Sequence, residues 1–244
     1  MTTTKYDKIT TKNIVDELNN KASISDAEPS FETLTMTKTQ YFDIPDNCAV
    51  GNTVILDGIE CLCVATDVTI QGSDLRRIAV DKNYDLGHYQ KYVGMTQNGI
   101  VISKIRYWRW GGYGTELGNT SKEIGYGLQN TINCLANLVN YTKGTYTETN
   151  YDGYPLLWQG VNDFRASQSD KWFVPSANEL NKYLWGYSGL KFDTATGGDY
   201  YYSYWSSTEG TAKRVYTINP YSSESSLGAS NKYSYSCVRL CRAF

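Results

Sequence analysis

The sequence predicts an α+β domain with antiparallel sheets and about two to three helices. Short apolar runs separated by turn residues come first, helical periodicity occupies the middle of the chain, and short strands with turns return after Gly197-Gly198. This order of strands, helices and strands indicates an α+β domain with antiparallel pairing.

The first expected strands lie at 54–56, 61–65 and 77–80, and the turn pairs Asp57-Gly58 and Gly72-Ser73 divide them. Apolar residues at spacings of three and four predict a helix over 128–141 and a second one over 156–166. Ser176 followed by Glu179 forms a capping-box pattern, which predicts that a third helix starts near Ala177. Between Trp108 and Gly127 we expect an ordered, glycine-rich loop.

The composition of the chain changes near residue 50, which divides the sequence into two parts. Residues 1–49 are polar and rich in threonine, and we interpret them as an N-terminal attachment or oligomerisation segment, with a flexible arm as the alternative. Residues 50–244 are expected to form the ligand-binding domain, with a variable region over about 200–244.

Composition and charge exclude several classes of function. Lys plus Arg number 23 against 25 Asp plus Glu, so there is no basic field for nucleic acid. No stretch of apolar residues is long enough to span a membrane, and the opening residues lack the apolar core of a secretory signal, so we expect synthesis in the cytosol. The sequence contains one histidine, so almost no side chain titrates near neutrality and the commonest general base and metal ligand is nearly absent. We therefore expect no catalytic residues, no metal site and no cofactor.

An unusual composition marks the segment 200–236, which holds eight Tyr and ten Ser. Tyrosine offers a large, rigid contact area and serine offers adaptable hydrogen bonds, as in antigen-combining loops. This composition favours recognition, although tyrosine and serine also fill ordinary exposed strands and turns. The segment ends in Cys237 to Phe244, where we expect a strand inside a sheet. The two cysteines there are too far apart to bridge on an extended strand, and we expect buried thiols.

Three runs in order carry a resemblance to a known family. They are Asp170-Lys171-Trp172-Phe173-Val174-Pro175-Ser176 with Glu179-Leu180-Asn181, then Tyr204-Trp205-Ser206-Ser207-Thr208-Glu209, then Val238-Arg239-Leu240-Cys241-Arg242-Ala243-Phe244. Together they resemble the C-type lectin-like variable proteins of diversity-generating retroelements, related to the phage major tropism determinant and to formylglycine-generating-enzyme-like lectin folds.

The resemblance implies a C-type lectin-like scaffold whose C-terminal stretch is diversified by adenine-directed mutagenesis. Scaffold positions would be Trp205, Ser206, Ser207, Arg239 and Phe244. The ligand-binding positions would be Tyr202, Tyr204, Gly210, Thr211, Lys213, Arg214, Asn219, Tyr221, Ser222, Ser230, Asn231, Ser234, Tyr235 and Ser236. The family's usual Ala-Trp reads Val215-Tyr216 here, and its second terminal Val reads Cys241.

Three alternatives stay open. The wider fold group includes oxidases with a C-terminal cysteine pair, but Cys237 and Cys241 are spaced C-x3-C where that class resembles C-x4-C. Calcium-dependent sugar binding is disfavoured because the Glu-Pro-Asn and Trp-Asn-Asp patterns of such lectins are missing, while glycan contact through tyrosine stays open. Trp108, Trp110 and Tyr113 either line the binding face or cover the core, and we favour the cover.

The expected function is that of a non-enzymatic receptor-binding protein on a phage tail, a fibre-tip adhesin assembled in the host cytoplasm and carried on the virion. The expected partner is a host cell-surface receptor, protein or glycan, bound by a homotrimer that gains avidity. The alternative is a cellular ligand-binding protein of the same fold, located in the cytoplasm or at the cell surface.

Overall fold

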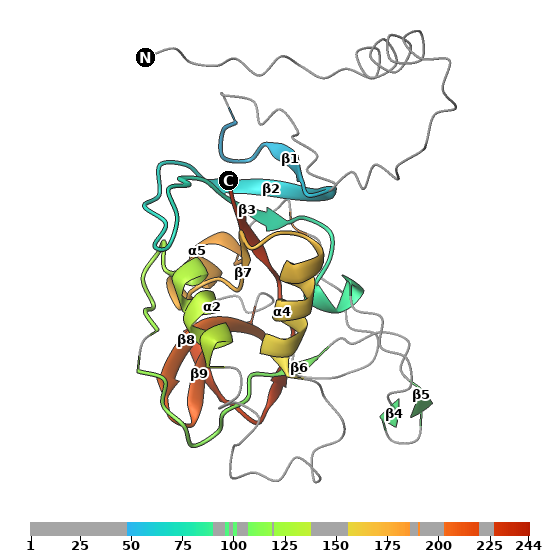
Figure 1. Cartoon of the computed structure of the whole chain (residues 1–244), viewed down its shortest axis with the longest axis vertical. Coiled ribbons are helices and arrows are strands. Elements are labelled where there is room, and N and C mark those ends of the chain that lie inside the picture. The colour runs from blue at the N-terminus through green and yellow to red at the C-terminus, as the bar shows by residue number, and fades with distance from the viewer. Residues whose placement is uncertain are drawn as a thin grey trace, which may run out of the picture. The chain divides into compact units, whose positions relative to one another are not determined.

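The computed structural model describes residues 48–89, 96–97, 100–101, 107–118, 120–137, 156–185, 190, 203–219 and 227–244. The expected attachment segment 1–49 therefore lies outside the described residues, apart from its last two positions. Within the described part, three α-helices and antiparallel sheets confirm the α+β class (Figure 1).

The largest sheet contains five strands in the order β1-β2-β3-β12-β7, and every neighbouring pair is antiparallel. Its strands are β1 (Thr53–Leu56), β2 (Ile59–Ala65), β3 (Ile78–Asp81), β12 (Cys241–Ala243) and β7 (Trp172–Phe173). The turn between β1 and β2 has Asp57 at φ 51° and Gly58 at φ 78°, as a two-residue hairpin of the expected kind requires. The C-terminal strand is confirmed, but it is restricted to Cys241–Ala243.

Both faces of the central strands of this sheet are buried, whereas the edge strand β1 exposes Thr53 and Ile55. Along β2, Cys61 and Cys63 belong to one hydrophobic cluster, whereas Leu62 and Val64 belong to a second cluster. Helix α4 (Leu157–Ser167) contributes Trp158 and other residues to the first cluster, and α5 (Ala177–Tyr183) contributes to the second. The two helices therefore cover opposite faces, which explains why β2 reads as a nearly continuous apolar run.

All three expected helices are present. Helix α2 spans Gly127–Ala136, so the helix predicted over 128–141 ends earlier, and 138–141 lie outside the described residues. Helix α5 begins after a complete capping box, in which the Ser176 hydroxyl accepts from the Glu179 amide and the Ser176 amide donates to Glu179 Oε2 at 2.7 Å. Helix η1 (Leu86–Tyr89) is a short 3-10 turn.

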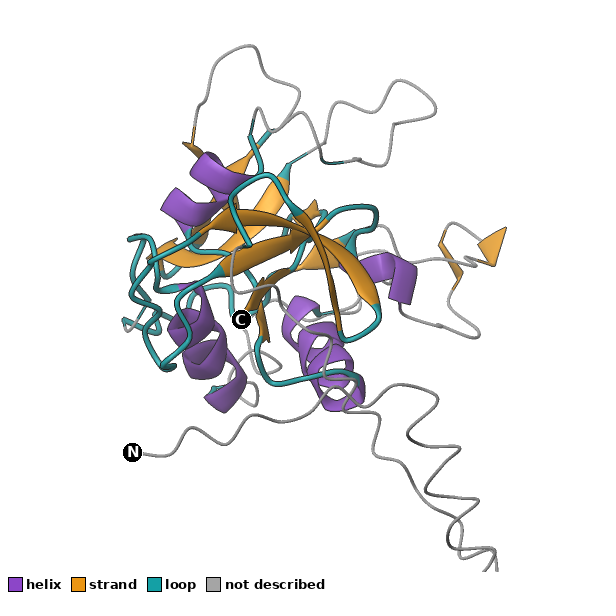
Figure 2. Cartoon of the chain, turned by 90° about the horizontal axis from the view of Figure 1, so that it is seen from above, coloured by secondary structure: helices purple, strands orange, loops and turns teal. Residues whose placement is uncertain are grey.

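A three-stranded antiparallel sheet follows toward the C-terminus, in the order β10-β9-β8. Its strands are β8 (Tyr204–Thr211), β9 (Arg214–Ile218) and β10 (Leu227–Asn231). Two further ribbons pair β6 (Trp108–Arg109) with β11 (Tyr235–Ser236) and β4 (Thr96–Gln97) with β5 (Ile100–Val101). Figure 2 shows the strands of the domain with the helices around them.

A polar network joins the C-terminal residues to the first strands. The Arg239 side chain is fully buried and donates to Asp85 Oδ1 at 2.6 Å and to the Asp81 carbonyl at 2.8 Å. Burial opposes the charge of Arg239, but the interactions with Asp85, Tyr204 and Asp81 together outweigh burial and raise the pKa of the guanidinium. The five residues expected at scaffold positions are all buried: Trp205, Ser206, Ser207, Arg239 and Phe244.

Candidate binding face

Near the turn between β8 and β9, the three-stranded sheet has one buried face and one accessible face. Along β9, Val215 and Thr217 are buried, whereas Arg214 is exposed and Tyr216 is half-buried between them. Alternate residues of a strand point to opposite faces, so Arg214 and Tyr216 belong to the outer face. The inner face packs on the core through Val215.

Tyr216 has small residues on both neighbouring strands. Ala229 of β10 lies directly opposite Tyr216, and a Cβ added at Gly210 of β8 would lie 3.5 Å from Cε2 of the tyrosine ring. The neighbouring strands therefore leave room for the ring on the outer face.

A cluster of aromatic and cationic side chains borders the same face. The rings of Tyr113 and Tyr233 lie 4.9 Å apart at an interplanar angle of 60°, and Lys213 Nζ lies 5.9 Å from the centre of the Tyr113 ring. Asn231 donates through Nδ2 to the Tyr233 hydroxyl at 3.0 Å and lies opposite Arg214 in the sheet register. We call Tyr113, Lys213, Arg214, Tyr216, Asn231 and Tyr233 the tyrosine face.

Main-chain hydrogen bonds hold the three contributing segments together. The Gly114 amide donates to the Ala212 carbonyl at 2.9 Å, which joins the loop 111–118 to the turn between β8 and β9. The Lys232 amide donates to the Lys213 carbonyl at 3.0 Å, and the Gly111 amide donates to the Lys232 carbonyl at 3.3 Å. The segments that carry Tyr113, Lys213 and Tyr233 are therefore fixed to one another.

A buried ion pair supports these segments. The side chains of Lys232 and Glu209 form a salt bridge with exposures of 0% and 4%, and Lys232 Nζ lies 5.0 Å from the centre of the Trp110 ring. Glu209 also accepts from the amide of Leu117 at 2.7 Å. Burial lowers the pKa of the Lys232 ammonium, and the hydrogen bond and charge of Glu209 oppose that shift.

The expected binding residues fall into distinct sets. Gly210, Thr211, Lys213 and Arg214 are exposed around the turn between β8 and β9, and Asn231 lies beside them in the sheet. Thr211 Oγ1 also accepts from the amides of Lys213 and Arg214, which stabilises that turn.

The other expected residues do not join this set. Asn219 is exposed beyond the other end of β9. Ser230 is half-buried and shares a hydrogen bond with Thr217 on the inner face at 3.2 Å, and Tyr235 packs on Tyr107 with ring centres 5.5 Å apart. Ser234 is half-buried in the turn after β10. Tyr202, Tyr221 and Ser222 lie outside the described residues.

Two expected binding residues need correction because they are buried. The Tyr204 hydroxyl donates to Asp85 Oδ2 at 2.9 Å, so this tyrosine belongs to the Arg239 network of the interior. The Ser236 hydroxyl shares a hydrogen bond with Ser203 at 2.6 Å inside the fold. Neither side chain can take part in an exposed face.

Sequence reasoning left three tyrosines out of the expected binding set. Tyr216 was detectable from the alternation with Val215 and Thr217, and Tyr233 belongs to the Tyr- and Ser-rich segment. Tyr113 comes from a distant loop, and no local pattern places it beside Tyr233. The expected cover of the core is confirmed for Trp108 and Trp110, which are fully buried, whereas Tyr113 is half-buried on the face.

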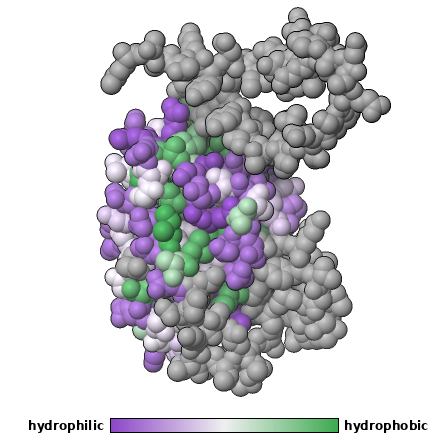
Figure 3. All heavy atoms as spheres, in the orientation of Figure 1, coloured by the Kyte–Doolittle hydropathy of each residue, from purple (hydrophilic) through white to green (hydrophobic). Residues whose placement is uncertain are grey.

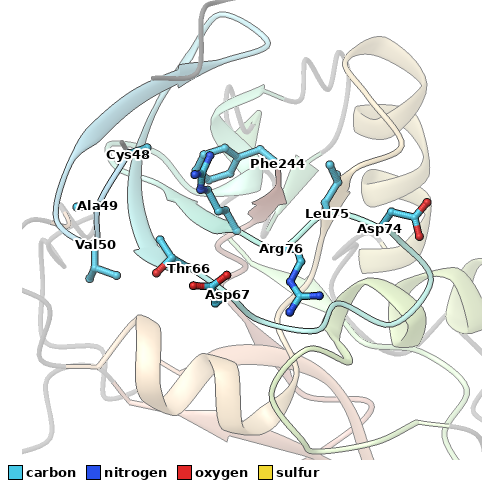
Figure 4. A pocket seen from close by; sticks show the side chains of 10 residues that line it. Cys48, Ala49, Val50, Thr66, Asp67, Asp74, Leu75, Arg76 and Phe244 are labelled. Atoms are coloured by element: carbon cyan, nitrogen blue, oxygen red, sulfur yellow. The ribbon is translucent and has the colours of Figure 1, made fainter. Parts of the chain in front are cut away.

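A hollow lies near the start of the described chain, apart from the tyrosine face. It has a volume of about 540 Å³ and is lined by Cys48, Ala49, Val50, Thr66, Asp67, Asp74, Leu75, Arg76, Arg77 and Phe244 (Figure 4). Its charged residues are two arginines and two aspartates, so the lining carries no net charge. The hollow does not include a residue of the tyrosine face.

The cysteines form no disulfide, and all six are buried. Burial raises the pKa of Cys241, and likewise raises the pKa of Cys63 to about 12. Within the described ranges, no group of three or more His, Cys, Asp or Glu side chains could hold a metal ion. No helix in that part of the chain is long and apolar enough to cross a membrane. Among the coloured residues on the side shown in Figure 3, hydrophilic side chains surround a band of hydrophobic ones, with a few smaller hydrophobic spots outside it.

No family model matches the chain, and comparisons with curated proteins and with solved structures found no match.

Proposed function

We propose that this chain is a non-enzymatic ligand-binding protein with a C-type lectin-like fold, and that it recognises its ligand with the tyrosine face. The observation that carries the proposal is the separation of roles in β9. Val215 and Thr217 are buried on one side, and Arg214 and Tyr216 are accessible on the other. Side chains on the outer side can change without removing contacts of the core.

The chemistry of the face supports recognition. Tyrosine and arginine are enriched among the residues that dominate binding energy, because each supplies a large contact area together with hydrogen-bonding groups. Three tyrosines, one arginine, one lysine and one asparagine make up the tyrosine face. Three segments that main-chain hydrogen bonds join supply these residues, and such pre-organisation lowers the entropic cost of binding.

The buried thiols support a non-enzymatic role over an oxidase. A cysteine that attacks a substrate does so as the thiolate and needs access to that substrate. Cys237 and Cys241 are buried, and burial raises the pKa of Cys241 above its ordinary value. Both features keep the C-terminal pair in an unreactive state.

We further propose that the C-terminal segment is diversified, as the resemblance in its motifs implies. Sequencing the gene from many independent isolates tests this proposal. Substitutions should concentrate at Gly210, Thr211, Lys213, Arg214 and Asn231, while buried positions such as Trp205 and Ser207 stay unchanged. Substitutions spread evenly over exposed and buried positions would contradict it.

We propose a phage tail fibre tip as the setting of this protein, and a cellular ligand-binding protein is the alternative. Neighbouring genes distinguish the two. Tail genes beside this gene support the phage, and a reverse transcriptase with a near-copy template repeat supports diversification in either setting.

A further inference from the structure

The cations of the tyrosine face carry unbalanced charge. Lys213 and Arg214 are exposed, and no carboxylate of the described residues forms an ion pair with either. Glu209 lies near them in sequence, but Lys232 already pairs with it in the interior. Glu116 is the one acidic residue of the loop 111–118 and is exposed. The face therefore carries local positive charge on a chain whose formal net charge is −2.

The hydrogen-bonding groups of the face are mainly donors. Arg214 offers five N–H groups in a planar fork and Lys213 offers three, and neither side chain can accept a hydrogen bond. The guanidinium fork matches the two oxygens of a carboxylate, and such charge-assisted pairs are about twice as strong as neutral hydrogen bonds. A ligand that fits these groups must present acceptors with negative charge.

We propose that the tyrosine face binds an acidic polypeptide segment, with Asp or Glu carboxylates on Lys213 and Arg214 and the neighbouring side chains on Tyr216 and Tyr233. This inference rests on the proposed function and names the chemistry of the partner. Half-buried tyrosines next to a cation suit a protein partner, because rigid aromatic contacts and arginine dominate protein interfaces.

Other anionic or polar ligands fit less well. Each cation neutralises about one phosphate, so two cations give a nucleic acid little affinity at physiological salt. Sugar hydroxyls donate as well as accept, and a glycan therefore needs acceptors in its site. On this face, the acceptors are the amide oxygen of Asn231 and the tyrosine hydroxyls, and they are fewer than the donors of Arg214, Lys213 and Asn231. The face therefore suits a ligand that mainly accepts better than it suits a glycan.

Fluorescence anisotropy with labelled poly-L-glutamate tests the proposal on the full chain. The wild-type protein should bind this probe, and the double variant Lys213→Glu/Arg214→Glu should weaken binding by at least about tenfold. The variant Tyr233→Ala should also weaken binding, because it removes a contact without changing the charge. Circular dichroism checks that each variant is folded.

A matched charge reversal is the control. Arg76→Glu/Lys182→Glu also replaces one arginine and one lysine at exposed positions, neither of which belongs to the face. This control should change affinity by less than about twofold. Equal weakening by the two double variants, or no binding of poly-L-glutamate to the wild type, would overturn the proposal.

The remaining probes separate failure of this inference from failure of the proposed function. Preferential binding of a sialylated glycan or of single-stranded DNA over poly-L-glutamate overturns the acidic polypeptide as the partner. The proposed function survives that result if binding still depends on the tyrosine face and the substitutions among isolates still concentrate there. The proposed function fails if the substitutions among isolates do not concentrate on the tyrosine face.

Discussion

Lys232 forms a salt bridge with Glu209 in the interior, and its two neighbours in sequence, Asn231 and Tyr233, belong to the tyrosine face. The lysine also donates to the Thr115 carbonyl at 2.6 Å, and Glu209 accepts from the Gly118 amide at 3.2 Å. The ion pair thus connects the loop 111–118 with β8 and with the turn after β10. The arrangement of the accessible tyrosine face therefore depends on a buried ion pair, Lys232 with Glu209.

Removing one partner of this ion pair should destabilise the protein strongly. Lys232→Met leaves Glu209 buried without its cation, and breaking a buried pair in this way costs about 3–5 kcal/mol. The double variant Lys232→Met/Glu209→Met removes both charges and should lose less free energy of unfolding than the single variant. Urea unfolding of the four proteins in this cycle provides the measurement. A double variant as unstable as the sum of the single variants would show that the two residues do not act as a pair.

Gly160 is required by close packing between α4 and β6. A Cβ at this position would lie 2.3 Å from Cζ3 of the buried Trp108 ring. Gly160→Ala should therefore lower the free energy of unfolding by about 1–3 kcal/mol, although alanine favours a helix. Asn162→Ala is the matched control on the exposed side of α4 and should be neutral or slightly stabilising. A Gly160→Ala variant with the same free energy of unfolding as the wild type would contradict this close packing.

Asp81 should give the protein a measurable pH dependence. Burial raises the pKa of its carboxyl above the ordinary value, although the Tyr89 hydroxyl and the amides of Asn83 and Tyr84 oppose that shift. The folded state therefore holds the proton more tightly than the unfolded state, so Asp81 costs stability as the pH rises above about 4. Asp81→Asn keeps an oxygen for the two amides and loses this dependence.

Urea unfolding at about pH 4.5 and about pH 7.5 checks this sign. The stability of Asp81→Asn relative to the wild type should increase toward the higher pH. A relative stability that stays constant or decreases would show that the pKa of Asp81 is not raised in the folded protein.

The thiols should be unreactive in the folded protein. All six cysteines are buried, and burial raises the pKa of Cys61, Cys63 and Cys241. A thiol reagent such as 5,5′-dithiobis(2-nitrobenzoate) near pH 8 should react slowly with the native chain and with all the cysteines after unfolding in guanidinium. Rapid reaction of one thiol in the native state would identify an accessible cysteine that this structure does not contain.

Local patterns predicted the local structure. The capping box at Ser176 and Glu179 and the turn at Asp57-Gly58 are both confirmed, because each depends on residues within four positions of one another. The class of fold followed from the order of such elements. The placement of β12 between β3 and β7 could not be predicted, since it pairs residues far apart in the chain.

The candidate site was predictable only in part. The turn residues Lys213 and Arg214 were expected on the face and are exposed there. The expectation that Tyr204 lies on the binding face was wrong, because β8 is buried on both sides over its first five residues. The register of β8 with β9 is also irregular after Trp205, so alternation along the strand does not predict which side chains are accessible. Composition identified a segment rich in tyrosine, but only the pairing of strands decides which of those rings are accessible.

In the proposed function, the interior specifies the fold and leaves the outer face of β9, β10 and the turn between β8 and β9 free to vary. Trp205 is fully buried and donates through Nε1 to the Trp108 carbonyl at 2.6 Å, so Trp205→Ala should lower the free energy of unfolding by about 3–5 kcal/mol.

The decisive measurement compares the free energy of unfolding of Trp205→Ala with that of the combined variant Lys213→Ala/Arg214→Ala/Tyr216→Ala/Asn231→Ala. We predict that the four changes on the face together lower it by less than about 2 kcal/mol, and by less than the single change in the core. A combined variant that loses as much stability as Trp205→Ala would show that the face is needed for folding, and would overturn this separation of roles.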